Sequence, residues 1–104
     1  MTDSDILSMT KLNLQLTGTA FDGYLSNMLI PAAKKAIGQE GITLDLDDIN
    51  DCNIVVMYAS YLYRRRADSE AGMPRMLRYA LNNRLFSEKA KSLATDSDSS
   101  GSES

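Results

Sequence analysis

The sequence contains no histidine and a single cysteine, Cys52. Without histidine, hydrolase mechanisms that use an imidazole base are excluded, and so are zinc sites built from several thiolate and imidazole ligands. One cysteine cannot form an internal disulfide. Its place in an apolar helical pattern predicts a buried side chain, because free cysteine packs as a small hydrophobe. We therefore expect a protein that is not an enzyme and that needs no metal or cofactor.

Long apolar runs are also missing. The longest, residues 54–63, is about half of the roughly 20 residues that a bilayer helix needs. Acidic residues follow Met1, which is the opposite of the basic start of a secretory signal. We expect synthesis in the cytoplasm and no membrane partner. The length of 104 residues, with 43% hydrophobic and 24% charged side chains, fits one globular domain.

The formal net charge of −3 conceals a division along the chain. Residues 1–63 carry eight acidic and three basic side chains, whereas residues 64–95 carry eight basic and three acidic ones. Residues 96–104 add three more acidic side chains. Residues 1–95 therefore have no net charge, but their acidic and basic side chains are concentrated in different parts of the chain. Such segregation bears on partners and association rather than on the fold.

Apolar spacing predicts an all-α fold, a small bundle of three to four helices around a long central one. The first helix is expected over residues 5–11, with Asp3 or Ser4 as its cap. Leucines at positions 12, 14 and 16 then alternate with polar residues, which predicts an extended segment.

The second helix has the clearest period. Thr19 with Asp22 resembles a capping box, and Gly38 is placed to end the helix in the left-handed conformation. Pro31 lies inside the pattern and predicts a kink. The expected buried stripe consists of Phe21, Tyr24, Leu25, Met28, Leu29, Ala32, Ala33, Ala36 and Ile37.

The central helix is expected over about residues 47–67, a length of ~31 Å at 1.5 Å per residue. Its middle is apolar nearly all round, so neighbours should touch it on several sides. The aspartates before it lack the ligand spacing of a calcium loop, and helix capping accounts for them. The expected cap is Asp45, Asp47 or Asp48.

A loop over residues 67–73 leads to Pro74, which suits the first position of the last helix. The buried stripe of that helix is expected to be Leu77, Ala80, Leu81 and Leu85. We divide the chain into a helical domain over residues 1–92 and a polar, acidic tail over residues 93–104 that is disordered unless bound.

Candidate contact residues come from the basic segment and its acidic counterpart. Three consecutive arginines at positions 64–66 spread over about 200° of a helix, so they cannot all face one ligand. A solvated helix end, a protein contact and a nucleic-acid contact all remain open for them. Tyrosine and arginine are enriched in protein interfaces, although tyrosine packing in the core is equally consistent. The candidates are Arg64, Arg65, Arg66, Arg75, Arg78, Asn82, Arg84, Tyr61, Asp45 and Asp48.

The order of these segments resembles that of a known family. A short first helix precedes residues 25–37, which read LSNMLIPAAKKAI. The central helix then reads VVMYASYLYRRR, and the last helix reads MPRMLRYALNNRLF after a short loop. Over about residues 5–87 this pattern is similar to the head-tail connector (adaptor) family of long-tailed bacteriophages, the siphophage neck ring.

The resemblance implies a structural subunit of the virion at the head-tail junction, assembled with itself into a ring that is typically a dodecamer. Such rings dock on the portal protein and present a platform for the head-completion or stopper protein. Double-stranded DNA passes through their lumen without sequence-specific binding. The acidic face of one subunit would meet the basic face of the next, and the last helix and tail would contact the portal.

An alternative is a small helical DNA-binding or packaging regulator that uses the basic segment from Arg64 to Arg78. It predicts duplex binding with a steep salt dependence. The acidic sequence pI of about 4.8 argues against tight binding to free nucleic acid.

Overall fold

The fold is all-α, as predicted. The computed structural model describes residues 2–70 and 72–103, with the side chains of Ser92 and of residues 94–103 left out. No strand occurs among these residues. The elements are α1 (Asp3–Leu14), α2 (Asp22–Tyr24), a π-helical turn (Leu25–Leu29), α3 (Ile30–Gln39), α4 (Ile49–Ala67) and α5 (Arg75–Glu103).

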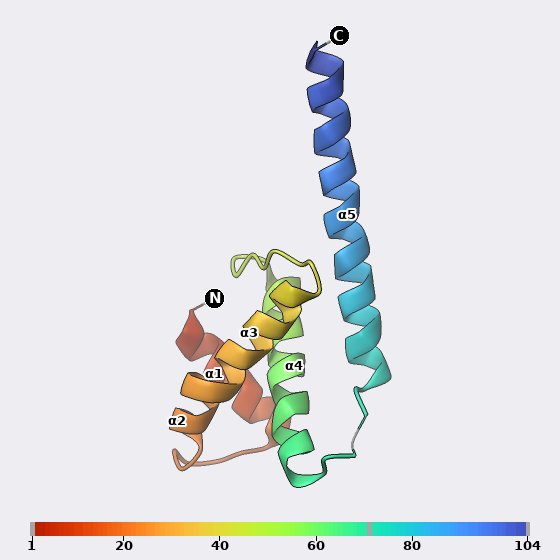
Figure 1. Cartoon of the computed structure of the whole chain (residues 1–104). Coiled ribbons are helices and arrows are strands. Elements are labelled where there is room, and N and C mark those ends of the chain that lie inside the picture. Colours follow the sequence, from red (N-terminus) through yellow and green to blue (C-terminus); the bar gives the residue numbers. More distant parts are fainter. Residues whose placement is uncertain (1, 71, 104) are drawn as a thin grey trace.

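Helix α4 is the centre of the bundle. Figure 1 shows α1 and α3 on one side of α4 and α5 on the other, with the C-terminal part of α5 extending past the bundle. The molecule measures 59 × 30 × 18 Å along its principal axes. The prediction of a central helix with several neighbours is confirmed. Its buried side chains are Asp51, Cys52, Ile54, Val55, Val56, Ala59, Ser60 and Tyr61.

Helix α1 differs from the sequence-based expectation at both ends. Thr2, rather than Asp3 or Ser4, is the cap, and its side chain and that of Asp5 form a capping box. The helix continues to Leu14, so the extended segment predicted from alternating leucines is wrong there. Leu12 is largely exposed, since alternation along the sequence does not place these leucines on one buried face.

The kink predicted at Pro31 takes the form of the π-helical turn directly before it. The Ile30 amide donates to the carbonyl of Leu25, five residues earlier, which widens the helix ahead of the proline ring. The extra residue in this turn shifts the phase of the buried stripe. Ile30 is buried, while Met28 and Ala32, which the simple period places inside, are exposed.

The turns after this helix also differ from expectation. No capping contact forms between Thr19 and Asp22 side chains, since the helix cap is Phe21 and has no side-chain hydrogen bond. Gly38 is helical, and the chain reverses instead at Gly41, whose φ is +102°. The positive φ favours glycine at this position, and a Cβ there would lie 3.3 Å from Cδ1 of Leu85, so that the leucine side chain would have to shift by a few tenths of an ångström.

The last two helices begin close to the predicted positions. Asp48 caps α4, because its Oδ1 accepts from the Asn50 amide at 2.8 Å. Pro74 stands one residue before α5 rather than in its first turn, and its carbonyl accepts from the Arg78 amide. The backbone of α5 is helical to Glu103, whereas the side chains of the predicted tail lie mostly outside the described ones, so its disorder stays a prediction.

Substitution of Leu81 tests how far the packing of α5 against the core stabilises the fold. It is fully buried in the core, so Leu81→Ala should lower the free energy of unfolding by about 2–5 kcal/mol. The matched control is Met76→Ala on the exposed side of the same helix, which should change it by less than about 0.5 kcal/mol. Urea unfolding followed by circular dichroism measures both, and equal effects would contradict this packing.

Candidate interaction surface

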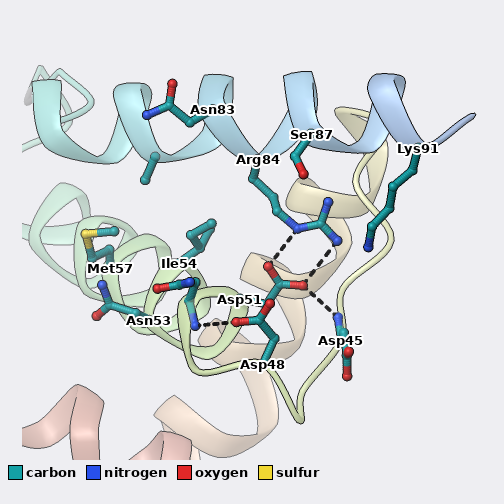
Figure 2. A pocket seen from close by; sticks show the side chains of 12 residues that line it. Asp45, Asp48, Asp51, Asn53, Ile54, Met57, Asn83, Arg84, Ser87 and Lys91 are labelled. Carbon is teal, nitrogen blue, oxygen red and sulfur yellow. Dashed lines mark hydrogen bonds and ion pairs between the residues drawn. The ribbon is translucent and has the colours of Figure 1, made fainter. Parts of the chain in front are cut away.

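A buried ion pair joins the first turn of α4 to α5. Asp51 is fully buried, and its carboxylate receives Nε of Arg84 at 2.7 Å and Nη2 at 3.2 Å. It also accepts from the backbone amide of Asp45 at 2.8 Å. Figure 2 shows this pair at the base of a polar cleft between α4 and α5. The carboxylate thus holds the α3–α4 connector, α4 and α5 together.

Arg84 uses every part of its guanidinium within the chain. Nη1 donates to Glu88 at 2.7 Å, and Nη2 donates to the carbonyl of Thr43 at 2.7 Å. These bonds raise the pKa of Arg84, with the hydrogen bond to Asp51 as the largest cause. The Arg84 hydrogen bond in turn lowers the pKa of Glu88. Arg84 was a candidate for contact with a partner, but its side chain is largely buried and each of its three nitrogens already donates within the chain.

Arg78 forms a second link to the first half of the chain. Its Nη1 lies 2.9 Å from Oε1 of Glu40, at the end of α3, and 3.4 Å from the side-chain oxygen of Asn82. The contact with Glu40 is partly buried, whereas the contact with Asn82 is exposed. Together, Arg78 and Arg84 bring basic residues of α5 against acidic residues of the first half within one molecule. Part of the charge that we expected to act between subunits is therefore neutralised within a single chain.

The three consecutive arginines at the end of α4 point to three different places. Arg64 donates to the carbonyl of Asn13 at 3.3 Å, and Arg65 donates to the hydroxyl of Tyr61 at 3.4 Å. Their separation agrees with the predicted spread around the helix. Tyr61 itself is buried, so its ring offers little surface to a partner.

Arg66 lies among three aromatic rings. Its guanidinium carbon is 5.4 Å from the ring centre of Phe21, 5.3 Å from that of Tyr24 and 5.0 Å from that of Tyr63. The rings of Phe21 and Tyr63 also meet edge to face at 5.8 Å. This cation–π cluster ties the start of α2 to the end of α4. Single-sequence spacing gives no signal for it, because its members lie about 40 residues apart.

The acidic candidates organise the connector before α4. Asp48 is the cap of α4, and Oδ1 of Asp45 accepts from the amide of Asp47 at 3.0 Å. All three side chains are exposed. The residue that sequence reasoning did not select is Asp51, although it belongs to the same acidic run. A burial signal was available, since Asp51 lies one turn before Val55 on the central helix.

Helix α5 carries a second apolar surface that faces away from α4. Leu77 and Leu81 are buried on the inner side, whereas large apolar side chains on the opposite side are exposed. At about 100° per residue these exposed positions fall within an arc of about 100°. We call this surface the α5 outer face. It comprises Met76, Tyr79, Phe86 and Leu93, which are 74%, 58%, 77% and 67% exposed.

The remaining candidates lie beside the outer face. Arg75 and Asn82 are exposed on α5, and Arg75 forms no ion pair with any residue that the structure describes. Among the ten candidate residues, the structure thus leaves Arg75 and the connector aspartates freest to meet a partner.

Comparison with protein-family models, with curated proteins and with solved structures finds no match to this chain. None of the helices that the structure describes is both long and apolar enough to cross a membrane.

The buried ion pair between Asp51 and Arg84 leads to a prediction about the free energy of unfolding. Arg84→Met leaves the buried Asp51 carboxylate without its cation and should lower the free energy of unfolding by about 3–5 kcal/mol. Arg75→Met, on the exposed side of α5, should cost less than about 0.5 kcal/mol. Adding Asp51→Asn to Arg84→Met should restore part of the loss, because the uncompensated charge is then removed. Additive effects of the two substitutions in urea unfolding would contradict a coupled pair.

The contact between Glu88 and Arg84 predicts that the stability of the fold depends on pH. Because its pKa is lowered in the folded chain, its contribution is present above the unfolded-state pKa of about 4.3 and is lost as the pH falls through the lowered value. Between about pH 5 and pH 3, wild type should therefore lose more stability than Glu88→Gln, which keeps an oxygen acceptor for Arg84. Glu70→Gln is the control, since Glu70 is in the loop before α5 and should leave the wild-type profile unchanged. Parallel curves for wild type and Glu88→Gln would refute the coupling.

Proposed function

We propose that this chain is a structural subunit of the head-tail connector ring of a long-tailed bacteriophage. In this role it docks on the portal protein and extends the DNA channel towards the head-completion or stopper protein and the tail. Its place is the virion neck, and double-stranded DNA passes through the ring without sequence-specific binding.

The observation that carries the proposal is the two-faced α5. One side of the helix packs on α4, and the opposite side presents large apolar groups that nothing in the described part of the chain covers. Exposed apolar surface of this kind marks protein interaction sites. A small all-α subunit whose longest helix has a second apolar face suits an assembly component.

The position of the chain end also supports this role. Helix α5 extends past the bundle, so the C-terminal residues lie away from the body formed by α1, α3 and α4 (Figure 1). In our proposal residues 94–104 contact the portal, and the rest of α5 contacts the ring. The polar composition of this segment suits a contact that forms by ordering on binding.

The alternative of a DNA-binding regulator has less support in the geometry. Such a protein needs several basic groups free to reach phosphates. Four of the five arginines in that segment already contact groups of their own chain: Arg64, Arg65, Arg66 and Arg78.

Co-assembly with the portal protein encoded in the same genome tests the proposal. Light scattering on the mixed proteins should detect a complex far larger than the portal alone, with several copies of this chain for each portal. Deletion of residues 94–104 should abolish docking, while the helical circular dichroism signal of the remaining chain persists, because the core cluster among the described residues is built from positions 6–85.

Two results would contradict the proposal. One is a chain that stays monomeric and never joins the portal. The other is tight binding to duplex DNA with a steep salt dependence, which would favour the alternative.

A further inference from the structure

The α5 outer face is apolar and exposed, and a second surface of the same chain has complementary chemistry. Its apolar groups extend about 25 Å along the helix from Met76 to Leu93. Arg75 and Lys89 lie beside these groups, and neither forms an ion pair within the part of the chain that is described. The complementary surface should therefore be apolar in the middle and acidic at its edge.

A groove between α1 and the start of α4 has this character. It is a cavity of about 290 Å³ lined by Met9, Ile49, Asn50, Cys52, Asn53 and Val56. Ile49 and Met9 are both exposed at its rim. We call it the α1–α4 groove.

Acidic side chains lie next to residues of this groove along the chain, although none is among the residues that line it. Asp47 and Asp48 directly precede Ile49 and are exposed. Asp5 lies one helical turn before Met9 on α1 and is also exposed. The charge around the groove is thus opposite to the charge beside the α5 outer face.

One molecule cannot join these two surfaces. Helix α1 and α5 pack on different sides of α4, and the outer face of α5 points away from α4 (Figure 1). Contact between the two surfaces therefore requires two copies. Because the surfaces differ, the contact is head to tail, and repetition of such a contact forms a ring when the rotation closes.

We propose that the α5 outer face of one copy packs into the α1–α4 groove of the next copy, with Arg75 and Lys89 against the aspartates at the rim. The inference rests on the proposed ring function for its biological role and names the surfaces by which the ring forms. The ion pairs of Arg78 and Arg84 take no part in this contact, since they hold each α5 to its own subunit.

Disulfide trapping between two different variants tests the contact. Both carry Cys52→Ser, which retains a hydroxyl donor for the carbonyl of Leu46. One adds Phe86→Cys on the outer face, and the other adds Ile49→Cys at the groove. Equal amounts are mixed at high concentration, without portal, under air oxidation. The mixed disulfide should form well above the yield of random pairing, and a partner variant with Ser87→Cys, which is exposed one position along α5, should not form it.

Charge reversal gives a second measurement on the same mixture. Lys89→Glu in the outer-face variant should reduce the mixed disulfide several-fold, and Asp47→Lys in the groove variant should restore it. A merely reactive cysteine pair would not respond in this paired way.

Two outcomes would overturn the inference. A dominant disulfide between two Phe86→Cys chains would show that outer faces pair with each other. Equal yields for Phe86→Cys and Ser87→Cys would show that no specific contact forms. Neither outcome depends on the portal, so a chain that forms the mixed disulfide yet never docks on the portal would refute the proposed function and leave this contact standing.

Discussion

A single buried carboxylate holds three parts of this molecule in one arrangement. Asp51 receives the guanidinium of Arg84 from α5 and the amide of Asp45 from the connector, while its own backbone is part of α4. A charge without solvent is stable only when its partners satisfy it, so the positions of the connector and α5 are constrained together. Arg84 strengthens this constraint by binding the carbonyl of Thr43 as well.

This constraint changes the meaning of the divided charge. The acidic first half and the basic segment suggest complementary faces on different subunits. The structure instead joins Arg84 to Asp51 and Arg78 to Glu40 within one chain. Outside these pairs, other charged groups are exposed at the surface, chiefly Arg75 and Lys89 on α5 and the aspartates of the connector before α4. Those groups flank apolar surface, which is the arrangement of an interface with a hydrophobic centre and a polar rim.

Helix α5 has its two-faced character because of where Asp51 and Arg84 place it. Its inner leucines fill the core beside α4, and the ion pair fixes which side of the helix faces inward. The opposite side must then be exposed, with Phe86 and Met76 in solvent. This exposed apolar side is the surface that the proposed association would cover.

Much of the fold could be predicted from apolar periodicity, and the misjudged places have local causes. The central helix, the loop before α5 and the all-α class follow from spacing and length. The extended segment at Leu12 was wrong because a short alternation cannot be distinguished from the end of a helix with an exposed leucine. The stripe near Met28 was wrong because a π-helical turn before Pro31 shifts the period by one residue, and the position of such a turn depends on packing. Gly38 and Gly41 are equally permissive as residues, and the sequence does not show that the chain takes its positive φ at Gly41 while Gly38 stays helical.

The candidate interaction surface, like the fold, could be predicted from the sequence only in part. By itself the sequence determined the helical class, the absence of histidine chemistry and the list of charged residues from which any contact must be drawn, because composition and period are local properties. Only the tertiary structure decided which of those residues are available. The ion pairs of Arg84 and Arg78 span more than 30 residues, as does the packing of Arg66 on Phe21 and Tyr24, and contacts between distant segments form only when the whole chain has folded.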